Sequence, residues 1–169
     1  MQQREDWYIV MSTHDRTGVT TDHGKMVRTA AMAVGAVFLL VGVLGFIPGI
    51  TSDYDTLAFA GHDSEAKLLG IFQVSILHNI VHLLFGIVGL ALARRTESAI
   101  SFLIGGGVVY LVLWLYGLVT HDTSTANFVP VNTADDWLHF VLGLGMIALG
   151  VLGRNAARSS RTATGPSYG

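Results

Sequence analysis

The sequence contains no cysteine, which excludes disulfide bonds, thiolate metal sites, cysteine-ligated iron–sulfur clusters and cysteine nucleophiles. Any bound metal would therefore need histidine, carboxylate or carbonyl ligands. Charged residues are also scarce, at 13% of 169 residues, and the net charge of −2 offers no basic surface to nucleic acid. The chain has only 3 prolines against 20 glycines, a balance that suits transmembrane helices, where glycine is more frequent than in soluble ones.

Apolar residues make up 51% of the chain, and they are gathered into long runs. A transmembrane helix needs roughly 20 predominantly apolar residues. Four segments meet this need, at about 27–47, 69–93, 102–119 and 137–152. The sequence therefore predicts an all-α fold, an integral membrane four-helix bundle made of two helical hairpins.

The membrane domain is predicted to cover residues 26–153. A polar N-terminal tail (1–25) precedes it, and a tail rich in Ser, Thr and Gly (154–169), predicted to be disordered, follows it. We expect the first apolar run to be a retained span, because no small-residue cleavage site ends it.

Two polar clusters predict where helices begin. Asp63, Ser64 and Glu65 form a good helix start, so the second helix is expected to begin in water before its apolar run. Thr133 is expected to cap the fourth helix, with Asp136 three residues later in the capping-box position.

The distribution of cations predicts the orientation, because short loops that are rich in Lys and Arg are retained on the cytoplasmic side of the membrane. The flanks that carry them hold Lys25, Arg28, Arg94, Arg95, Arg154, Arg158 and Arg161. The two other loops hold Asp53, Asp55, Asp63, Glu65 and Asp122 against the single Lys67. Both termini are therefore predicted to be cytoplasmic, in a protein that crosses a bacterial cytoplasmic membrane four times.

Small residues recur at three-, four- and seven-residue steps along the spans, a pattern typical of close helix packing in membranes. The glycines assigned to packing are Gly35, Gly42, Gly45, Gly86, Gly89, Gly143 and Gly150. The second and fourth spans also share a local pattern of two polar residues, a histidine and then a glycine one turn later. This pattern is compatible with a parallel internal repeat of two hairpins.

Three histidines lie on these small-residue faces, so they are predicted to face the bundle interior. They are His78, His82 and His139. If the second and fourth spans are neighbours, these residues form one polar pocket, open to the outside, with Asp135, Asp136 and Asn79 at its rim. Ionisable residues at membrane depth mark a candidate functional site.

Several chemistries fit this cluster. His78, His82, His139 and Asp135 could ligate a divalent metal, although HNIVH lacks the glutamate of HExxH metalloproteases. His82 and His139 could be the axial ligands of haem b. A proton or quinone pathway would also use a histidine that titrates near neutrality. In the simplest interpretation each histidine only fastens neighbouring helices, and no cofactor is bound. A ligand cage could be formed by Tyr110, Trp114 and Tyr116 of the third span with Trp137 at the head of the fourth, but these residues are expected to pack or to anchor the interface.

The chain resembles a family of small four-helix membrane proteins, largely actinobacterial, catalogued only as a domain of unknown function (DUF4383-like). The resemblance rests on GVLGFIPGIT (42–51), YDTLAFAGHDSEAKLLGIFQVSILHNIVHLLFGIVGLALARR (54–95), GGGVVYLVLWLYG (105–117) and NFVPVNTADDWLHFVLGLGMIALG (127–150). It implies the same four-helix topology and carries no activity with it.

The leading expectation is an uncharacterised, non-enzymatic structural or accessory component of the cell envelope. Its partners would be the lipid bilayer and either other envelope proteins or a second copy, packed through the glycine stripes and outer loops, with no nucleic acid. The alternative is a haem- or metal-binding subunit that handles electrons or protons through the histidines, and the third possibility is a small-solute transporter.

Overall fold

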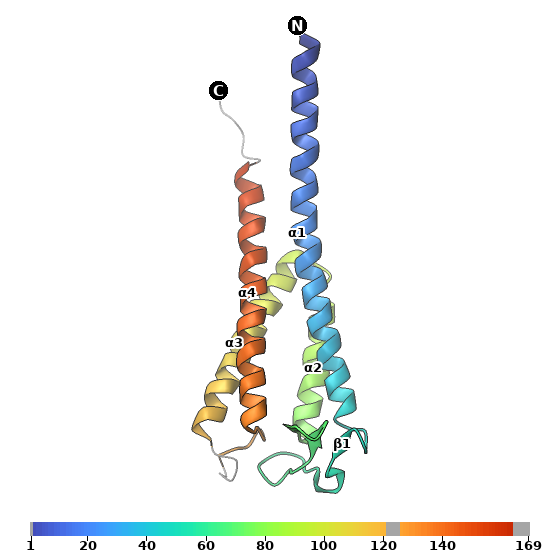
Figure 1. The fold of residues 1–169 in the computed structure, drawn as a ribbon, viewed down its shortest axis with the longest axis vertical. Coiled ribbons are helices and arrows are strands. Elements are labelled where there is room, and N and C mark those ends of the chain that lie inside the picture. Colours follow the sequence, from blue (N-terminus) through green and yellow to red (C-terminus); the bar gives the residue numbers. More distant parts are fainter. Residues whose placement is uncertain (1, 121–125, 164–169) are drawn as a thin grey trace.

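The computed structural model describes residues 2–120 and 126–163, with side chains for 23–120 and 126–159. The described chain is mostly helical (Figure 1). Its helices are α1 (Gln2–Leu44), α2 (Ile76–Leu92), α3 (Thr96–Val119) and α4 (Thr133–Ala163). Between α1 and α2 lie a 3₁₀ turn, η1 (Tyr54–Thr56), and three short strands, β1 (Thr51–Ser52), β2 (Lys67–Leu68) and β3 (Phe72–Gln73). The predicted four-helix fold is confirmed.

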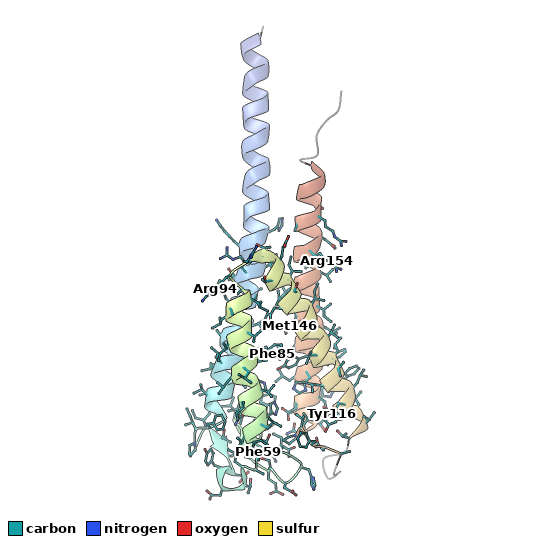
Figure 2. The ribbon with its side chains drawn as sticks, turned by 180° about the vertical axis from the view of Figure 1, so that it is seen from behind. Phe59, Phe85, Arg94, Tyr116, Met146 and Arg154 are labelled. Carbon is teal, nitrogen blue, oxygen red and sulfur yellow. The ribbon has the colours of Figure 1, made fainter. Side chains whose placement is uncertain are left out.

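The helices pair as two hairpins, α1 with α2 and α3 with α4. The N-terminal end of α1 and the C-terminal end of α4 lie at one end of the molecule, which we call the terminal end (Figure 1). The strands lie at the opposite end, which we call the strand end. The helices α2 and α3 meet near Arg94 and diverge toward the strand end, so the two hairpins are splayed (Figure 2).

Three helical segments are long and apolar enough to cross a membrane, namely His23–Leu44, Thr96–Val119 and Thr133–Ser159. The fourth, α2, has 17 residues and is about 25 Å long at 1.5 Å per residue, short of a hydrocarbon core of about 30 Å. Exposed apolar side chains, such as Leu40, Leu84, Val112 and Val141, cover the outside of all four helices. An apolar exterior of this extent is typical of lipid contact.

The helix α2 begins later than the sequence predicts. Residues 67–73, the expected start of the second span, form β2 and β3, joined through a tight turn in which Leu69 and Gly70 have positive φ angles of 55° and 70°. Strand pairing, not a helix, therefore satisfies the backbone here. The helix starts at Ile76, after Ser75, whose side chain accepts a hydrogen bond from the His78 amide at 3.1 Å. Asp63, Ser64 and Glu65 lie in the loop before β2 and start no helix.

The start of α4 is capped one residue earlier than predicted. The Asn132 side-chain oxygen accepts hydrogen bonds from the amides of Ala134 (2.9 Å) and Asp135 (3.1 Å). In return, the Asp135 carboxylate accepts one from the Asn132 amide at 3.0 Å. This is a capping box of Asn132 and Asp135, in place of the predicted pair of Thr133 and Asp136.

Both tails are helical where they are described. The helix α1 begins at Gln2, inside the predicted polar tail of residues 1–25. The helix α4 continues through Ala163, so residues 154–163 of the predicted disordered tail are helical, whereas 164–169 lie outside the described residues. At the junction of α1 with α2, the Arg28 guanidinium donates a hydrogen bond to the carbonyl of Ala93, the C-cap of α2, at 3.1 Å.

The glycine stripes hold each hairpin together. A Cβ added to Gly35 would lie 3.1 Å from the Gly86 carbonyl oxygen, and one added to Gly86 would lie 2.7 Å from that of Gly35. Gly107 and Gly143 make the equivalent contact between α3 and α4. The other glycines assigned to packing, Gly42, Gly45, Gly89 and Gly150, also meet atoms of a neighbouring helix. All of these contacts lie within one chain.

Two glycines of α3 that lie two residues apart provide a matched test of this packing. A Cβ on Gly107 would lie 2.7 Å from the Gly143 carbonyl oxygen, whereas one on Gly105 would meet no described atom within 4 Å. We expect Gly107→Ala to force α3 and α4 apart and to lower the free energy of unfolding by about 1–3 kcal/mol. Gly105→Ala should be neutral or stabilising by up to about 1 kcal/mol. Unfolding in mixed micelles, followed by circular dichroism, compares the two; equal losses would contradict the packing role.

Candidate functional site: a histidine–tyrosine cluster between the hairpins

Two of the histidines project from the first two turns of α2. His78 and His82 lie one turn apart on the same face, and their rings stack at 4.5 Å between centroids with 27° between planes. Their position follows from the cap at Ser75, which fixes where the helix begins. The rings therefore face the space between the hairpins at the strand end of the molecule.

The hydrogen bonds of His82 assign the proton on its ring. The Nδ1 atom lies 3.0 Å from the His78 carbonyl oxygen, and because a carbonyl can only accept, this nitrogen carries the hydrogen. In the neutral ring Nε2 is then the acceptor, and the Tyr110 hydroxyl of α3 lies 3.5 Å from it. A hydroxyl bond is normally near 2.7–2.8 Å, so this one is weak, and the hydroxyl is free to turn toward another partner.

His139 of α4 completes the group from the opposite hairpin. Its ring lies 6.4 Å from that of His78 and 5.1 Å from that of Tyr110, between centroids. We call His78, His82, Tyr110 and His139 the His–Tyr cluster. The backbones of α2 and α4 pack little against each other, so these side chains span the space between them.

Two ring nitrogens in the cluster make no hydrogen bond within the described structure. The Nδ1 atoms of His78 and His139 are buried and have no hydrogen-bond partner among the described residues. His139 is only 3% exposed. Because an unpaired buried polar group costs about 1–3 kcal/mol, such atoms call for an explanation, such as a bound molecule.

Two cavities of about 110 Å³ each adjoin the cluster, and all four of its residues line both. The first, the side cavity, lies between α2 and α3 and is completed by Ser75, Leu77, Val81, Leu113 and Val129. The second, the cap cavity, lies between the strands and the cluster. It is completed by Val41, Leu68, Leu69, Phe72, Val74, Asp135, Leu138 and Leu142. The cluster thus forms the wall between the two cavities.

The interior is filled on the terminal side of the cluster. Phe38 stacks on Tyr110 at 5.3 Å and contacts the His82 ring at 5.5 Å. Phe85 packs against Phe38 at 5.0 Å, and Phe85 and Met146 both lie against Gly106 (Figure 2). These side chains fill the space between the helices on the terminal side of the cluster.

A loop cover that the sequence did not predict lies over the strand end, and the cap cavity behind it is lined in part by Leu69, which is 60% exposed. The outward opening of the pocket stays a prediction. Loops from both hairpins join across the strand end: the Gln73 amide donates to Asp135 at 3.0 Å, and the Asn132 side chain donates to the Ile71 carbonyl at 2.8 Å. The Gly61 amide donates to the Phe128 carbonyl at 2.8 Å. Backbone pairing in residues 45–75 builds this cover, which the sequence had assigned in part to a helix.

Comparison of the sequence with known protein families matches residues 28–152 to the family described as "Domain of unknown function (DUF4383)". The chain belongs to this family. The match covers α1 from Arg28 onward, α2, α3, α4 as far as Leu152, the strands and the whole His–Tyr cluster. No curated protein and no solved structure matches the chain.

The DUF4383 structure brings together some of the predicted site residues and separates others. His78, His82 and His139 meet, and Asp135 lines the cap cavity while its carboxylate binds two backbone amides. Asn79 instead faces α1, where its side chain lies against Gly45. Asp136 faces α3 and lies against Gly117. Each residue of an α-helix is rotated by about 100° from the one before it, so residues adjacent to a histidine or to Asp135 point in another direction.

Tyr110 is the member of the cluster that the sequence did not assign to the site. It follows Gly106 by four residues on the buried face of α3. The small-residue rule that placed the histidines would have placed Tyr110 as well, had it been applied to the third span.

The described residues favour neither predicted cofactor. Among residues 23–120 and 126–159, whose side chains are described, no three His, Asp or Glu side chains are grouped to hold a metal ion. Asp135, the proposed fourth ligand, is engaged by the amides of Gln73 and Asn132. Each cavity is well below the 300–1,000 Å³ typical of sites for drug-sized ligands, so a haem would not fit without rearrangement of the helices.

Proposed function

We propose that this protein crosses a bacterial cytoplasmic membrane several times and binds a small uncharged molecule at the His–Tyr cluster. The observation that carries this proposal is the pair of unpartnered, buried Nδ1 atoms of His78 and His139 beside two cavities. Neutral imidazole can donate a hydrogen bond from one nitrogen and accept one at the other. The cluster therefore suits a ligand that makes directional hydrogen bonds without carrying charge.

The charge distribution supports an orientation with the terminal end in the cytoplasm. The cations Lys25, Arg28, Arg94, Arg95, Arg154 and Arg158 belong to that end, where Figure 2 labels Arg94 and Arg154. The acidic residues Asp53, Asp55, Asp63 and Glu65 belong to the strand end, with Lys67. This arrangement follows the positive-inside rule. The side chains of Arg161 and Asp122, also used in the sequence prediction, lie outside the described residues.

The lining of the side cavity supports an uncharged ligand. Besides the cluster it contains Ser75 and four apolar residues, and none of its lining residues is Asp, Glu, Lys or Arg. A charged group would be desolvated there without a counter-ion, which is costly at membrane depth. A structural role through the glycine stripes has less support, because these stripes already pack within the chain.

This proposal predicts a copurifying molecule. Protein purified in mild detergent and extracted with organic solvent should release about one equivalent of a small organic compound, detected by mass spectrometry. Tyr110→Phe, which removes only the hydroxyl near His82, should reduce its yield at least several-fold. Far-ultraviolet circular dichroism controls for folding.

The same preparation tests the haem and metal alternatives. A Soret band, or a stoichiometric metal that disappears in His82→Ala, would contradict the uncharged organic ligand and favour a cofactor-binding subunit. Wild-type protein that releases no compound above the level of a matched detergent blank would contradict the binding function itself.

A further inference from the structure

We infer that the ligand of the His–Tyr cluster is the headgroup of a prenylated quinone, which enters sideways from the lipid between α2 and α3. This inference rests on the proposed function, and it adds the class of ligand and its route.

The side cavity reaches the lipid-facing surface. Val81 lines it and is also 50% exposed on the outer face of α2. Leu77 of α2 and Leu113 of α3, both partly exposed, line the same opening. The two helices diverge here, since they meet near Arg94 and separate toward the strand end (Figure 2). The mouth of the cavity is therefore apolar and lies between two membrane helices.

Side chains and loops bound the cluster on its two other sides. Phe38 and Phe85 fill the interior on the terminal side. On the strand side, Pro130 and Val131 are buried within the covering loop, and Val129 closes the end of the cavity. A ligand that enters from the lipid does not have to pass through either barrier. A long apolar tail could then stay in the bilayer while the headgroup occupies the cavity.

The chemistry of the wall selects the headgroup. A phosphate, carboxylate or ammonium would find no opposite charge among the lining residues, which disfavours phospholipids and fatty acids. A quinone presents carbonyl acceptors on a planar ring, and its reduced form presents hydroxyl groups at the same positions. The free Nδ1 atom of His139 can donate or accept according to its tautomer, so it suits both forms. The free Nδ1 atom of His78 is an acceptor, because the other ring nitrogen donates to the Pro130 carbonyl, and it suits the hydroxyl of the reduced form. The weakly held Tyr110 hydroxyl can supply a further donor.

Retention of added quinone tests this inference directly. The full-length protein is reconstituted in lipid nanodiscs that contain a benzoquinone or a naphthoquinone, each with a short prenyl tail. Quinone per protein is measured after extraction and corrected for protein-free nanodiscs. Wild-type protein should retain about one equivalent of at least one of the two probes, and His139→Phe should lower the retained amount at least tenfold.

Two valines on the same face of α2 test the route. Val81→Trp should fill the mouth of the side cavity and lower retention at least fivefold, because the tail must pass there. Val88 lies seven residues further on, is 49% exposed and lines neither cavity, so Val88→Trp should retain quinone like the wild type. Circular dichroism and gel filtration establish that each variant is folded. Because the two valines are almost equally exposed, an added indole should change contact with lipid to the same extent at both sites.

The possible failures are distinguishable. If neither quinone is retained, but a copurifying compound is present and is lost in Tyr110→Phe, the quinone assignment is overturned and the proposed function stands. If quinone is retained equally by Val81→Trp, the sideways route is overturned. If neither quinone nor any copurifying compound is found, both the inference and the proposed function fall.

Discussion

Replacing Asp135 with alanine is expected to lower the free energy of unfolding by about 3–5 kcal/mol. The Asp135 side chain is almost completely buried, at 2% exposed for the residue, and its Oδ2 atom accepts hydrogen bonds from the amides of Gln73 and Asn132, both at 3.0 Å. Each hydrogen bond to a charged group contributes about 1.5–3 kcal/mol, and its loss would leave a buried amide unpaired. The loss also removes half of the capping box of α4.

Two variants provide the controls for this prediction. Asp135→Asn keeps an oxygen acceptor and loses the charge, so it should cost less, about 1–2 kcal/mol. Asp63 has a carboxylate that is exposed at the strand end, and Asp63→Ala should change stability by less than about 0.5 kcal/mol. Unfolding in mixed micelles, followed by circular dichroism, compares all three. If Asp135→Ala lowered the free energy of unfolding no more than Asp63→Ala does, the carboxylate would not join the hairpins.

Asp135 also affects the site, because it fixes how far apart the hairpins stand at the strand end. Gln73 lies two residues before the cap of α2, and Asn132 is the cap of α4. A carboxylate bound to both therefore sets the position of the first two turns of each helix, from which His78 and His139 project. The sequence pointed to Asp135 as a metal ligand, whereas in the structure it ties the two helix starts together.

The sequence was most informative where a residue pattern has only one physical interpretation. Long apolar runs with flanking cations predicted the helices, and the small-residue faces placed His78, His82 and His139 in one interior cluster. Residues 67–73 were assigned to a helix because a short apolar run reads equally as strand or helix. Gly70, with its positive φ, was the available signal for a turn.

The parts that could not be predicted depend on tertiary contacts. The helix α3 is apolar on all sides, so hydrophobic periodicity does not indicate the face of Tyr110, and only its four-residue spacing from Gly106 does. The loop cover at the strand end depends on hydrogen bonds between residues 60 or more positions apart, such as that of Asn132 with Ile71. Asn79 follows His78 directly, yet it contacts α1, because adjacent helical residues point in different directions.

The largest functional effect is expected from His139→Phe, which should abolish ligand binding while the protein becomes more stable. The Nδ1 atom of His139 is buried without a partner among the described residues, whereas the ring itself packs against Tyr110 at 5.1 Å. Phenylalanine keeps an aromatic ring and removes the unpaired nitrogen. We therefore expect a gain in the free energy of unfolding of about 1 kcal/mol in ligand-free protein.

The sign of this change separates the two explanations of the histidines. If His139 only fastened α4 to its neighbours, its loss would destabilise the protein, as the loss of an interhelical hydrogen bond does by about 0.6–2 kcal/mol. If the nitrogen is kept for a ligand, its loss stabilises the empty protein and lowers the bound quinone at least tenfold. Stability is measured after the ligand has been extracted, since a bound molecule would itself stabilise the wild type. A polar atom retained at a cost to stability is typical of sites where binding is required.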